Sequence, residues 1–225
     1  MSYTLNDGQI AIASEMDQSP NAPSEGGTDW NIRKIALNRA LIDYKNSREW
    51  ESLKVPFNSK VTVAGFATVG LPDNFDKMDT KVGIVWDGFT FSEFPVINPS
   101  DNKNYTDSDL FVNIFTNSRD GKYMYIHSPT LSSGASIQGM IYRSPQSLAS
   151  ATDIIECDDP TYIVQRGLYY IYKGREDGRF PEAKVEADKI LARMMENEAS
   201  LGKGYKDRSI SNQLEQRGFR VGRDG

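Results

Sequence analysis

A long β-rich stretch separates two helical stretches in this 225-residue chain. Between residues 60 and 141, short runs of β-branched and aromatic residues alternate with turn residues, a pattern typical of strands. Elements of one type follow one another instead of alternating, which indicates an α+β protein. We therefore predict a helical bundle made of residues 29–58 and 143–201, with an inserted antiparallel β subdomain of residues 59–142.

Two Asp-Gly pairs predict hairpin turns inside the β-rich stretch. Asp87-Gly88 and Asp120-Gly121 each lie between two strand-like runs. Asp-Gly supplies the left-handed backbone conformations that a tight hairpin turn requires. We therefore expect antiparallel strand pairs around both turns.

A segment without Gly or Pro predicts the first helix of the bundle. It follows Thr28 or Asp29, both of which are good helix N-caps, and it continues to Trp50. At 100° per residue its apolar side chains fall on two stripes. One stripe holds Trp30, Leu37, Leu41 and Tyr44, and the other holds Ile32, Ile35 and Ile42. A helix that is apolar on two sides needs neighbours on both.

The second helical stretch contains a Tyr-rich helix. A short helix is predicted at residues 145–151, and Asp159 followed by Pro160 then marks the start of the Tyr-rich one. Apolar and Tyr side chains surround nearly its whole circumference, so we expect it to be enclosed. Their surface exceeds what a small bundle can cover, which makes Tyr169 and Tyr172 candidates for a subunit interface.

Two polar arms of opposite charge are predicted at the ends of the chain. Residues 1–28 are rich in Ser, Asn, Gly and Pro and contain no Lys or Arg, so an extended acidic arm is expected. The last amphipathic helix begins at Pro181 and is expected to stop at Gly202. Residues 202–225 then carry six basic groups among glycines and are expected to become ordered only on a partner. Solvated ends without a function are the alternative for both arms.

Residues that could build an active site or a metal site are scarce. Cys157 and His127 are the only residues of their kinds, so an internal disulfide and a zinc site of Cys and His ligands are excluded. Asp158 and Asp159 fit a helix cap better than a catalytic pair of acids. The Asp-rich residues 101–109 lack oxygen ligands at required calcium positions, and no Gly-rich phosphate loop is present. We expect no enzymatic activity, no cofactor and no bound metal.

Charge and hydropathy restrict the partners. A net charge of -5 argues against a protein whose main task is to coat nucleic acid. No run approaches the roughly 18 consecutive apolar residues of a membrane span. The first residues lack the basic region of a secretory signal. We expect a protein that is made in the cytoplasm and does not bind membranes.

Four segments occur in a distinctive order. They are residues 48–54 (REWESLK), residues 71–75 (LPDNF), Ile141-Tyr142 with Pro145, and the helical residues 160–195. In this order and spacing, residues 29–201 resemble the head-to-tail adaptor subunits of tailed bacteriophages, also called connector or gatekeeper-ring proteins. The acidic arm before Asp29 has no counterpart in that pattern.

The resemblance implies a structural virion protein of the phage neck, made in the host cytoplasm. It implies a dodecameric ring between the portal protein and a tail tube or nozzle protein, with DNA passing through the lumen without sequence-specific contacts. Families of this kind often use a terminal arm to grip the portal, which makes apolar and basic residues of the C-terminal arm candidates for docking. These candidates are Tyr205, Arg208, Arg217, Phe219, Arg220 and Arg223.

Two alternatives stay open. The chain could be another neck protein, such as a tail-completion factor, which would bind a different partner. It could also be a carbohydrate-binding or enzymatic virion module on the β subdomain. In that case Trp86, Phe89 and Phe91 would stack on sugar rings.

Overall fold

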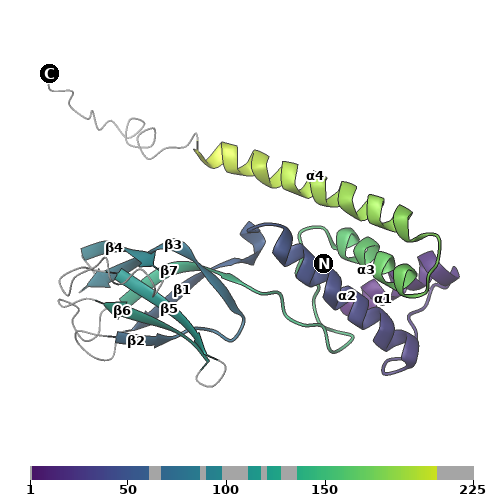
Figure 1. Ribbon diagram of the computed structural model, residues 1–225, viewed down its shortest axis with the longest axis horizontal. Coiled ribbons are helices and arrows are strands. Elements are labelled where there is room, and N and C mark those ends of the chain that lie inside the picture. The colour runs from purple at the N-terminus through teal and green to yellow at the C-terminus, as the bar shows by residue number, and fades with distance from the viewer. Residues whose placement is uncertain are drawn as a thin grey trace. The chain divides into compact units, whose positions relative to one another are not determined.

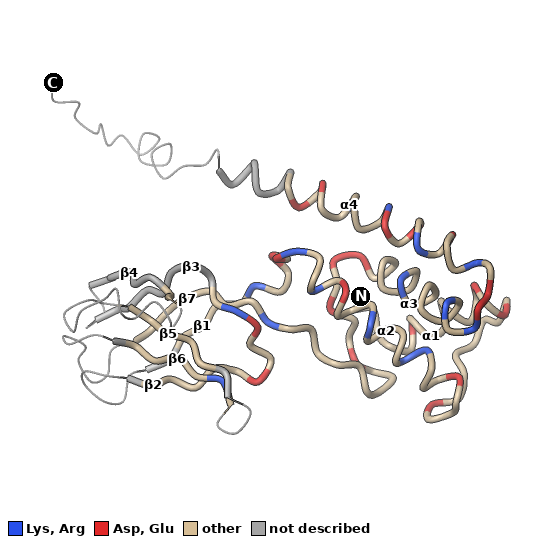
Figure 2. The backbone as a smooth tube through the Cα atoms, viewed as in Figure 1, with Lys and Arg blue, Asp and Glu red and all other residues tan. Residues whose placement is uncertain are grey.

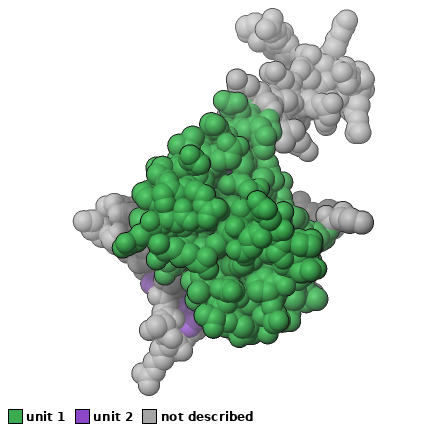
Figure 3. All heavy atoms as spheres, turned by 90° about the vertical axis from the view of Figure 1, so that its right-hand side faces the viewer, with its two compact units in different colours: residues 1–44, 148–225 green, residues 45–147 purple. Residues whose placement is uncertain are grey.

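The computed structural model describes residues 2–60, 67–86, 90–97, 111–117, 121–127 and 136–206. Four α-helices and a seven-stranded sheet make the protein α+β, as the sequence predicts. The chain forms two compact units (Figures 1 and 3). The helical unit comprises residues 1–44 and 148–225, and the sheet unit comprises residues 45–147.

The boundaries of the units differ from the predicted ones. The sequence placed the insert at residues 59–142, whereas the sheet unit begins at residue 45 and ends at residue 147. Strand β1 (Lys54–Lys60) belongs to the sheet, although residues 54–58 were assigned to the bundle. Strand β7 (Ser136–Arg143) pairs with β1 along its whole length, and this tertiary pairing fixes where the sheet begins.

The described part of the helical unit contains four helices: α1 (Leu5–Asp17), α2 (Thr28–Ser47), α3 (Pro160–Gly174) and α4 (Phe180–Lys206). The predicted short helix at residues 145–151 is wrong, because the chain there has no helical turn. The predicted stop at Gly202 is also wrong, because α4 continues to Lys206. One glycine inside a helix costs only about 1 kcal/mol relative to Ala, too little to end a long helix by itself.

The extended N-terminal arm expected at residues 1–28 is wrong for its first half, which forms α1. Thr4 caps this helix: its Oγ1 accepts from the Asp7 N–H at 3.3 Å, and the Asp7 carboxylate accepts from the Thr4 N–H at 2.8 Å. This reciprocal capping box satisfies backbone donors at the helix start. Leu5 and Ile12 on α1 are fully buried, so the segment belongs to the core of the helical unit.

The N-terminus is also fixed by backbone hydrogen bonds. The Leu5 N–H donates to the Asp153 carbonyl at 2.7 Å, and the Ile155 N–H donates to the Tyr3 carbonyl at 2.9 Å. Thr4 and Ile154 form an isolated antiparallel β-bridge between these bonds. The segment before α1 is therefore held by the segment before α3.

Leu37 on α2 fills the point where three helices meet. A Cβ atom added to Gly8 on α1 would lie 3.2 Å from Leu37 Cδ1, and one added to Gly167 on α3 would lie 3.2 Å from Leu37 Cδ2. Real Cβ contacts are seldom so short, so both glycines permit the close approach of α1 and α3 to α2. Leu37 has no exposed surface.

The sheet unit holds seven strands in the order β1-β7-β3-β4-β5-β6-β2. The strands not yet given are β2 (Ala67–Gly70), β3 (Phe75–Trp86), β4 (Thr90–Ile97), β5 (Phe111–Asn117) and β6 (Gly121–His127). The antiparallel pairs expected on either side of the two Asp-Gly turns are present, β3 with β4 and β5 with β6, whereas residues 87–89 and 118–120 of the turns lie outside the described residues. The sheet is not wholly antiparallel as expected, because β4 and β5 run parallel.

The sheet unit has its own core. It is formed by buried apolar side chains from β1, β2, β3, β5, β6 and β7 and from the segment after β2: Phe57, Val69, Leu71, Phe75, Met78, Val112, Met124, Ile126, Ile137 and Ile141. A core of this kind allows the sheet unit to form separately from the helical unit.

Candidate functional site

The solvent face of α2 is apolar. Ile32 is 41% exposed, Ile35 52% and Ile42 57%, and the exposed Arg39 lies among them at helical spacing. We call these four residues the α2 stripe. The other predicted stripe of α2 is buried, with Leu37 and Tyr44 fully enclosed. The sequence therefore predicted both faces, and the structure shows that one copy of the chain covers only one of them.

In an isolated subunit the α2 stripe leaves apolar surface in contact with water, which is unfavourable in free energy. Burying an isoleucine side chain completely is favourable by about 1.5–3 kcal/mol, and each of the three is only partly buried. Single exposed apolar residues are normal, but three on one helix face form a continuous row. A row of this kind is a candidate for contact with another protein.

A second exposed apolar feature lies on α4. Val185 is 53% exposed in a shallow groove of about 360 Å³. We call this feature the α4 groove, and it is lined by Pro181, Glu182, Val185, Glu186 and Lys189. Acidic and basic residues are mixed along the described part of α4, as the red and blue segments of Figure 2 show. The groove therefore combines an apolar centre with a charged rim.

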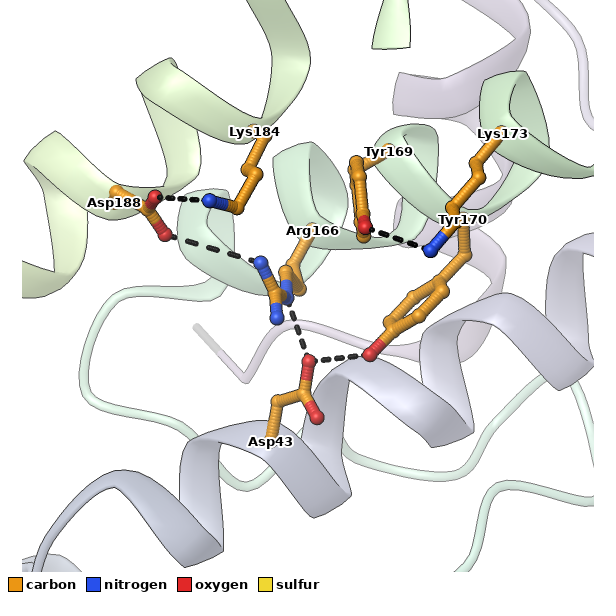
Figure 4. A network of polar contacts seen from close by, with 7 residues as sticks. All are labelled: Asp43, Arg166, Tyr169, Tyr170, Lys173, Lys184 and Asp188. Atoms are coloured by element: carbon orange, nitrogen blue, oxygen red, sulfur yellow. Dashed lines mark hydrogen bonds and ion pairs between the residues drawn. The ribbon is translucent and has the colours of Figure 1, made fainter. Parts of the chain in front are cut away.

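A polar network centred on Arg166 of α3 connects the helices that carry these two surfaces (Figure 4). Arg166 Nε donates to Asp43 Oδ2 on α2 at 2.6 Å, and the Tyr170 hydroxyl donates to the same oxygen at 2.5 Å. On its other side, Arg166 Nη1 lies 3.8 Å from Asp188 Oδ1 on α4. Lys184 lies 3.6 Å from the Asp188 carboxylate. The network thus places α3 between α2 and α4.

Electrostatics favour the charged form of Arg166. Burial by itself would lower the pKa of Arg166, but the hydrogen bond and charge of Asp43 outweigh burial and raise it. Burial and the hydrogen bond to Asp43 raise the pKa of Tyr170, which keeps its hydroxyl protonated as a donor. The Arg166 guanidinium also lies over the Tyr169 ring, 4.9 Å from its centroid. The arrangement positions helices and offers no nucleophile.

The two tyrosines predicted at a subunit interface have different environments. Tyr172 is 5% exposed and packs inside the helical unit beneath the Arg179 guanidinium, 4.4 Å from the ring centroid. Its assignment to an interface is therefore wrong, because the fold of a single subunit already buries it. Tyr169 is half-buried, and its hydroxyl accepts from Lys173 Nζ at 3.3 Å. Only Tyr169 keeps surface for a neighbour.

The predicted portal-docking residues lie at or beyond the end of the described chain. Tyr205 falls in the last turn of α4, so its backbone is helical rather than part of a free arm. Arg208, Arg217, Phe219, Arg220 and Arg223 lie outside the described residues. The aromatic residues considered for sugar stacking divide similarly: the backbones of Trp86 and Phe91 lie in β3 and β4, and Phe89 is outside the described residues.

The groups considered for catalysis have structural roles where they are described. Asp159 caps α3, with its carboxylate accepting from the Thr161 N–H at 3.0 Å, and Asp158 accepts from the Tyr44 hydroxyl at 3.1 Å. Burial raises the pKa of the Cys157 thiol to about 12, and the charges of Asp158 and Asp159 add to the effect. At neutral pH this thiol stays protonated, and a protonated thiol is a poor nucleophile.

The described ranges contain neither a candidate metal site nor a candidate membrane span. No group of three or more His, Cys, Asp or Glu side chains there could hold a metal ion. No helix in that part of the chain is long and apolar enough to cross a membrane. The Asp-rich residues 101–109, weighed as a calcium loop, lie outside the description.

A pocket of about 640 Å³ lies in the sheet unit, where the two edge strands β1 and β2 approach each other. It is lined by residues 55–58 of β1, by residues 70–72 and Asn74 beside β2, and by Ile141 and Arg143 of β7. Its lining is mixed and holds no cluster of acids or nucleophiles.

Comparison with known proteins finds no family model that matches the chain and no curated protein similar to it. The α2 stripe was visible in the sequence through its 3.6-residue period. The Arg166 network was not, because nothing in the local sequence connects α3 to Asp43.

Proposed function

We propose that the protein is a structural subunit of the head-to-tail adaptor ring of a tailed bacteriophage. The observation that carries the proposal is the α2 stripe: a helix whose inner face fills the core of one subunit presents a second apolar face to solvent. A ring gives every copy the same neighbours on both sides, so such a face is covered throughout the assembly. Its work is geometric, and no residue is assigned a catalytic role.

The division into two units supports the same proposal. The helical unit would form the wall of the ring, and the sheet unit, with a core of its own, would carry contacts to a tail tube or nozzle protein. DNA would pass through the lumen. A net charge of -5 suits a channel that must let DNA slide, because tight phosphate binding requires clustered positive charge.

The portal grip is proposed for residues 207–225 together with the end of α4. Arg208, Arg217, Arg220 and Arg223 would pair with acidic groups of the portal, and Tyr205 and Phe219 would supply apolar anchors. A segment with this composition becomes ordered when it binds and is sensitive to salt. Because α4 continues to Lys206, residues 207–225 would begin directly at the end of this helix.

Native mass in the presence and absence of partners tests the proposal. The purified 25.2 kDa protein is measured by light scattering alone, with the portal protein from the same phage, and with the tail tube protein. A closed ring that binds portal is the expected result. A protein that remains at 25.2 kDa and ignores the portal would overturn the proposal. Binding to the tail tube alone would instead identify a tail-completion protein.

A further inference from the structure

Two surfaces of the helical unit carry charges without partners. Arg39 in the α2 stripe has no hydrogen bond or ion pair among the described residues. The same is true of Glu182 in the α4 groove, within the described chain. Among the residues that the structure describes, Glu186 beside it pairs with the exposed Lys189, at 3.4 Å. One surface therefore offers an unpaired cation within an apolar row, and the other offers an unpaired anion beside an apolar hollow.

The two surfaces also fit in shape. Residues at positions 32, 35, 39 and 42 form a ridge along α2, because steps of three and four residues stay on one helix face. The α4 groove follows positions 181, 182, 185, 186 and 189, which border the hollow between neighbouring rows of a helix. Ridges of side chains on one helix pack into grooves of this kind on another.

Within one copy the two surfaces cannot meet. Arg166 of α3 bonds to Asp43 of α2 on one side and reaches Asp188 of α4 on the other, so α3 separates the two helices (Figure 4). The buried residues of α4, among them Ala187 and Ile190, lie on the face opposite Val185. Contact between the α2 stripe and the α4 groove therefore requires two copies.

We propose that the α2 stripe of one copy docks into the α4 groove of the next copy, with Arg39 paired to Glu182. The inference rests on the proposed ring function and names the surfaces that would build the ring. Two different surfaces meet in this contact, so each copy keeps one of each for further neighbours. A heterologous contact of this kind closes into a ring when its rotation is suitable.

Charge disfavours the symmetric alternatives. A contact of the α2 stripe with itself would bring two copies of Arg39 to one two-fold axis. A contact of the α4 groove with itself would bring together four carboxylates, from Glu182 and Glu186 of both copies, with only the two copies of Lys189 in the lining to balance them. Like charges at the centre of an interface oppose association, whereas the mixed contact pairs opposite charges beside buried apolar side chains.

The test uses one variant on each surface and a matched control. I35D places a charge in the α2 stripe, V185D places one in the α4 groove, and I154D places one at a third exposed site of equal exposure (52%, 53% and 51%). Helix content and melting temperature are measured for each, and mass is measured by analytical ultracentrifugation. I154D should assemble like the unmodified chain. I35D and V185D should each remain monomers, because each lacks one of the two surfaces that every link requires.

Mixing the two monomeric variants separates the proposed contact from a symmetric one. I35D retains an intact α4 groove and V185D an intact α2 stripe, so the mixture should form dimers and nothing larger. R39E and E182R should each weaken association at least about tenfold, and the double variant R39E/E182R should restore most of the loss.

The outcomes distinguish the inference from the function on which it rests. If V185D assembles as the unmodified chain does, or the mixed variants fail to pair, the proposed contact is overturned while the ring is not. If the unmodified chain stays at 25.2 kDa at every concentration, with portal or without, both the ring and the contact are overturned.

Discussion

Arg166 on α3 donates a hydrogen bond from Nε to Oδ2 of Asp43 on α2 across 2.6 Å, although 123 positions separate the two residues in the chain. The same Asp43 oxygen accepts from the Tyr170 hydroxyl. One carboxylate of α2 thus fixes two side chains of α3. We therefore expect the Asp43 carboxylate to contribute to the stability of the helical unit.

Replacing Asp43 by Asn should lower the free energy of unfolding by about 1–3 kcal/mol, because a partly buried guanidinium loses its charged acceptor. The change is measured by urea denaturation. K189A is the control, since Lys189 and Glu186 form an exposed pair at 3.4 Å and its loss should change stability by less than about 0.5 kcal/mol. Equal effects of D43N and K189A would contradict the structural role of the Arg166 network.

Gly167 is expected to tolerate no larger side chain. A Cβ atom there would lie 3.2 Å from Leu37 Cδ2 and 3.7 Å from Ile12 Cδ1. G167V should therefore destabilise the protein by about 1–3 kcal/mol through overpacking. G174A, on the same helix with open space around it, should be neutral or slightly stabilising. The melting temperatures of the two variants are compared. If G167V and G174A melted at the same temperature, α3 would not pack on Leu37 as described.

Thr4 should matter to stability although it lies near the end of the chain. T4A removes the side-chain acceptor for the Asp7 N–H and should cost about 0.5–2 kcal/mol. S14A on the exposed side of α1 is the control and should be neutral. Chemical denaturation compares the two variants. If T4A left the free energy of unfolding unchanged, the first residues would not contribute to the stability of the helical unit, which would contradict their place in its core.

Cys157 should react slowly in the folded protein. Burial raises its pKa to about 12, from an ordinary value of about 8.5, so the folded state keeps a proton that the unfolded state loses as pH rises between these values. This group therefore makes stability fall with rising pH above about 8.5. Labelling by iodoacetamide at pH 8.5 should be much slower in buffer than in urea, and C157S should show no label. Equal rates in buffer and urea would contradict a buried, protonated thiol.

Deleting residues 207–225 should leave the folded protein intact, since the described core ends within α4. Under the proposed function the truncated protein should still form a ring but should lose portal binding in a pull-down at physiological salt. A chain with R217Q, R220Q and R223Q should bind portal weakly and show a smaller dependence on salt than the unmodified chain. If the truncated protein bound the portal as tightly as the full chain, residues 207–225 would not be the portal-binding segment, and another surface would have to bind the portal.

The sequence by itself determined the features that depend on local periodicity and local turn chemistry. The two stripes of α2 follow from the spacing of Trp30, Leu37, Ile35 and Ile42 alone, and one of them is buried as expected. Asp159 before Pro160 predicted the start of α3, because the cap and the fixed proline backbone act within one helical turn. The antiparallel pairing of β3 with β4 and of β5 with β6 was predictable from the Asp-Gly pairs for the same reason.

The sequence-based prediction was wrong where a weak local preference for one backbone conformation is outweighed by packing against residues far along the chain. Residues 1–28 are rich in Ser, Asn, Gly and Pro, so the sequence suggested an extended arm that included residues 5–17. They fold as α1 because Leu5 and Ile12 find a core formed with α2 and α3, and because the segment bonds to residues 151–155. Composition alone cannot include the free energy of packing against helices far along the chain.

The tertiary structure alone decided which surfaces remain open. The sequence suggested interface candidates on the Tyr-rich α3, and it indicated only that the two apolar stripes of α2 need neighbours. Packing buries Tyr172 inside one subunit and leaves Ile32, Ile35 and Ile42 in solvent. Periodicity assigns residues to a face of their own helix, but only the placement of neighbouring helices determines which faces one chain can cover, because burial is a property of pairs of surfaces.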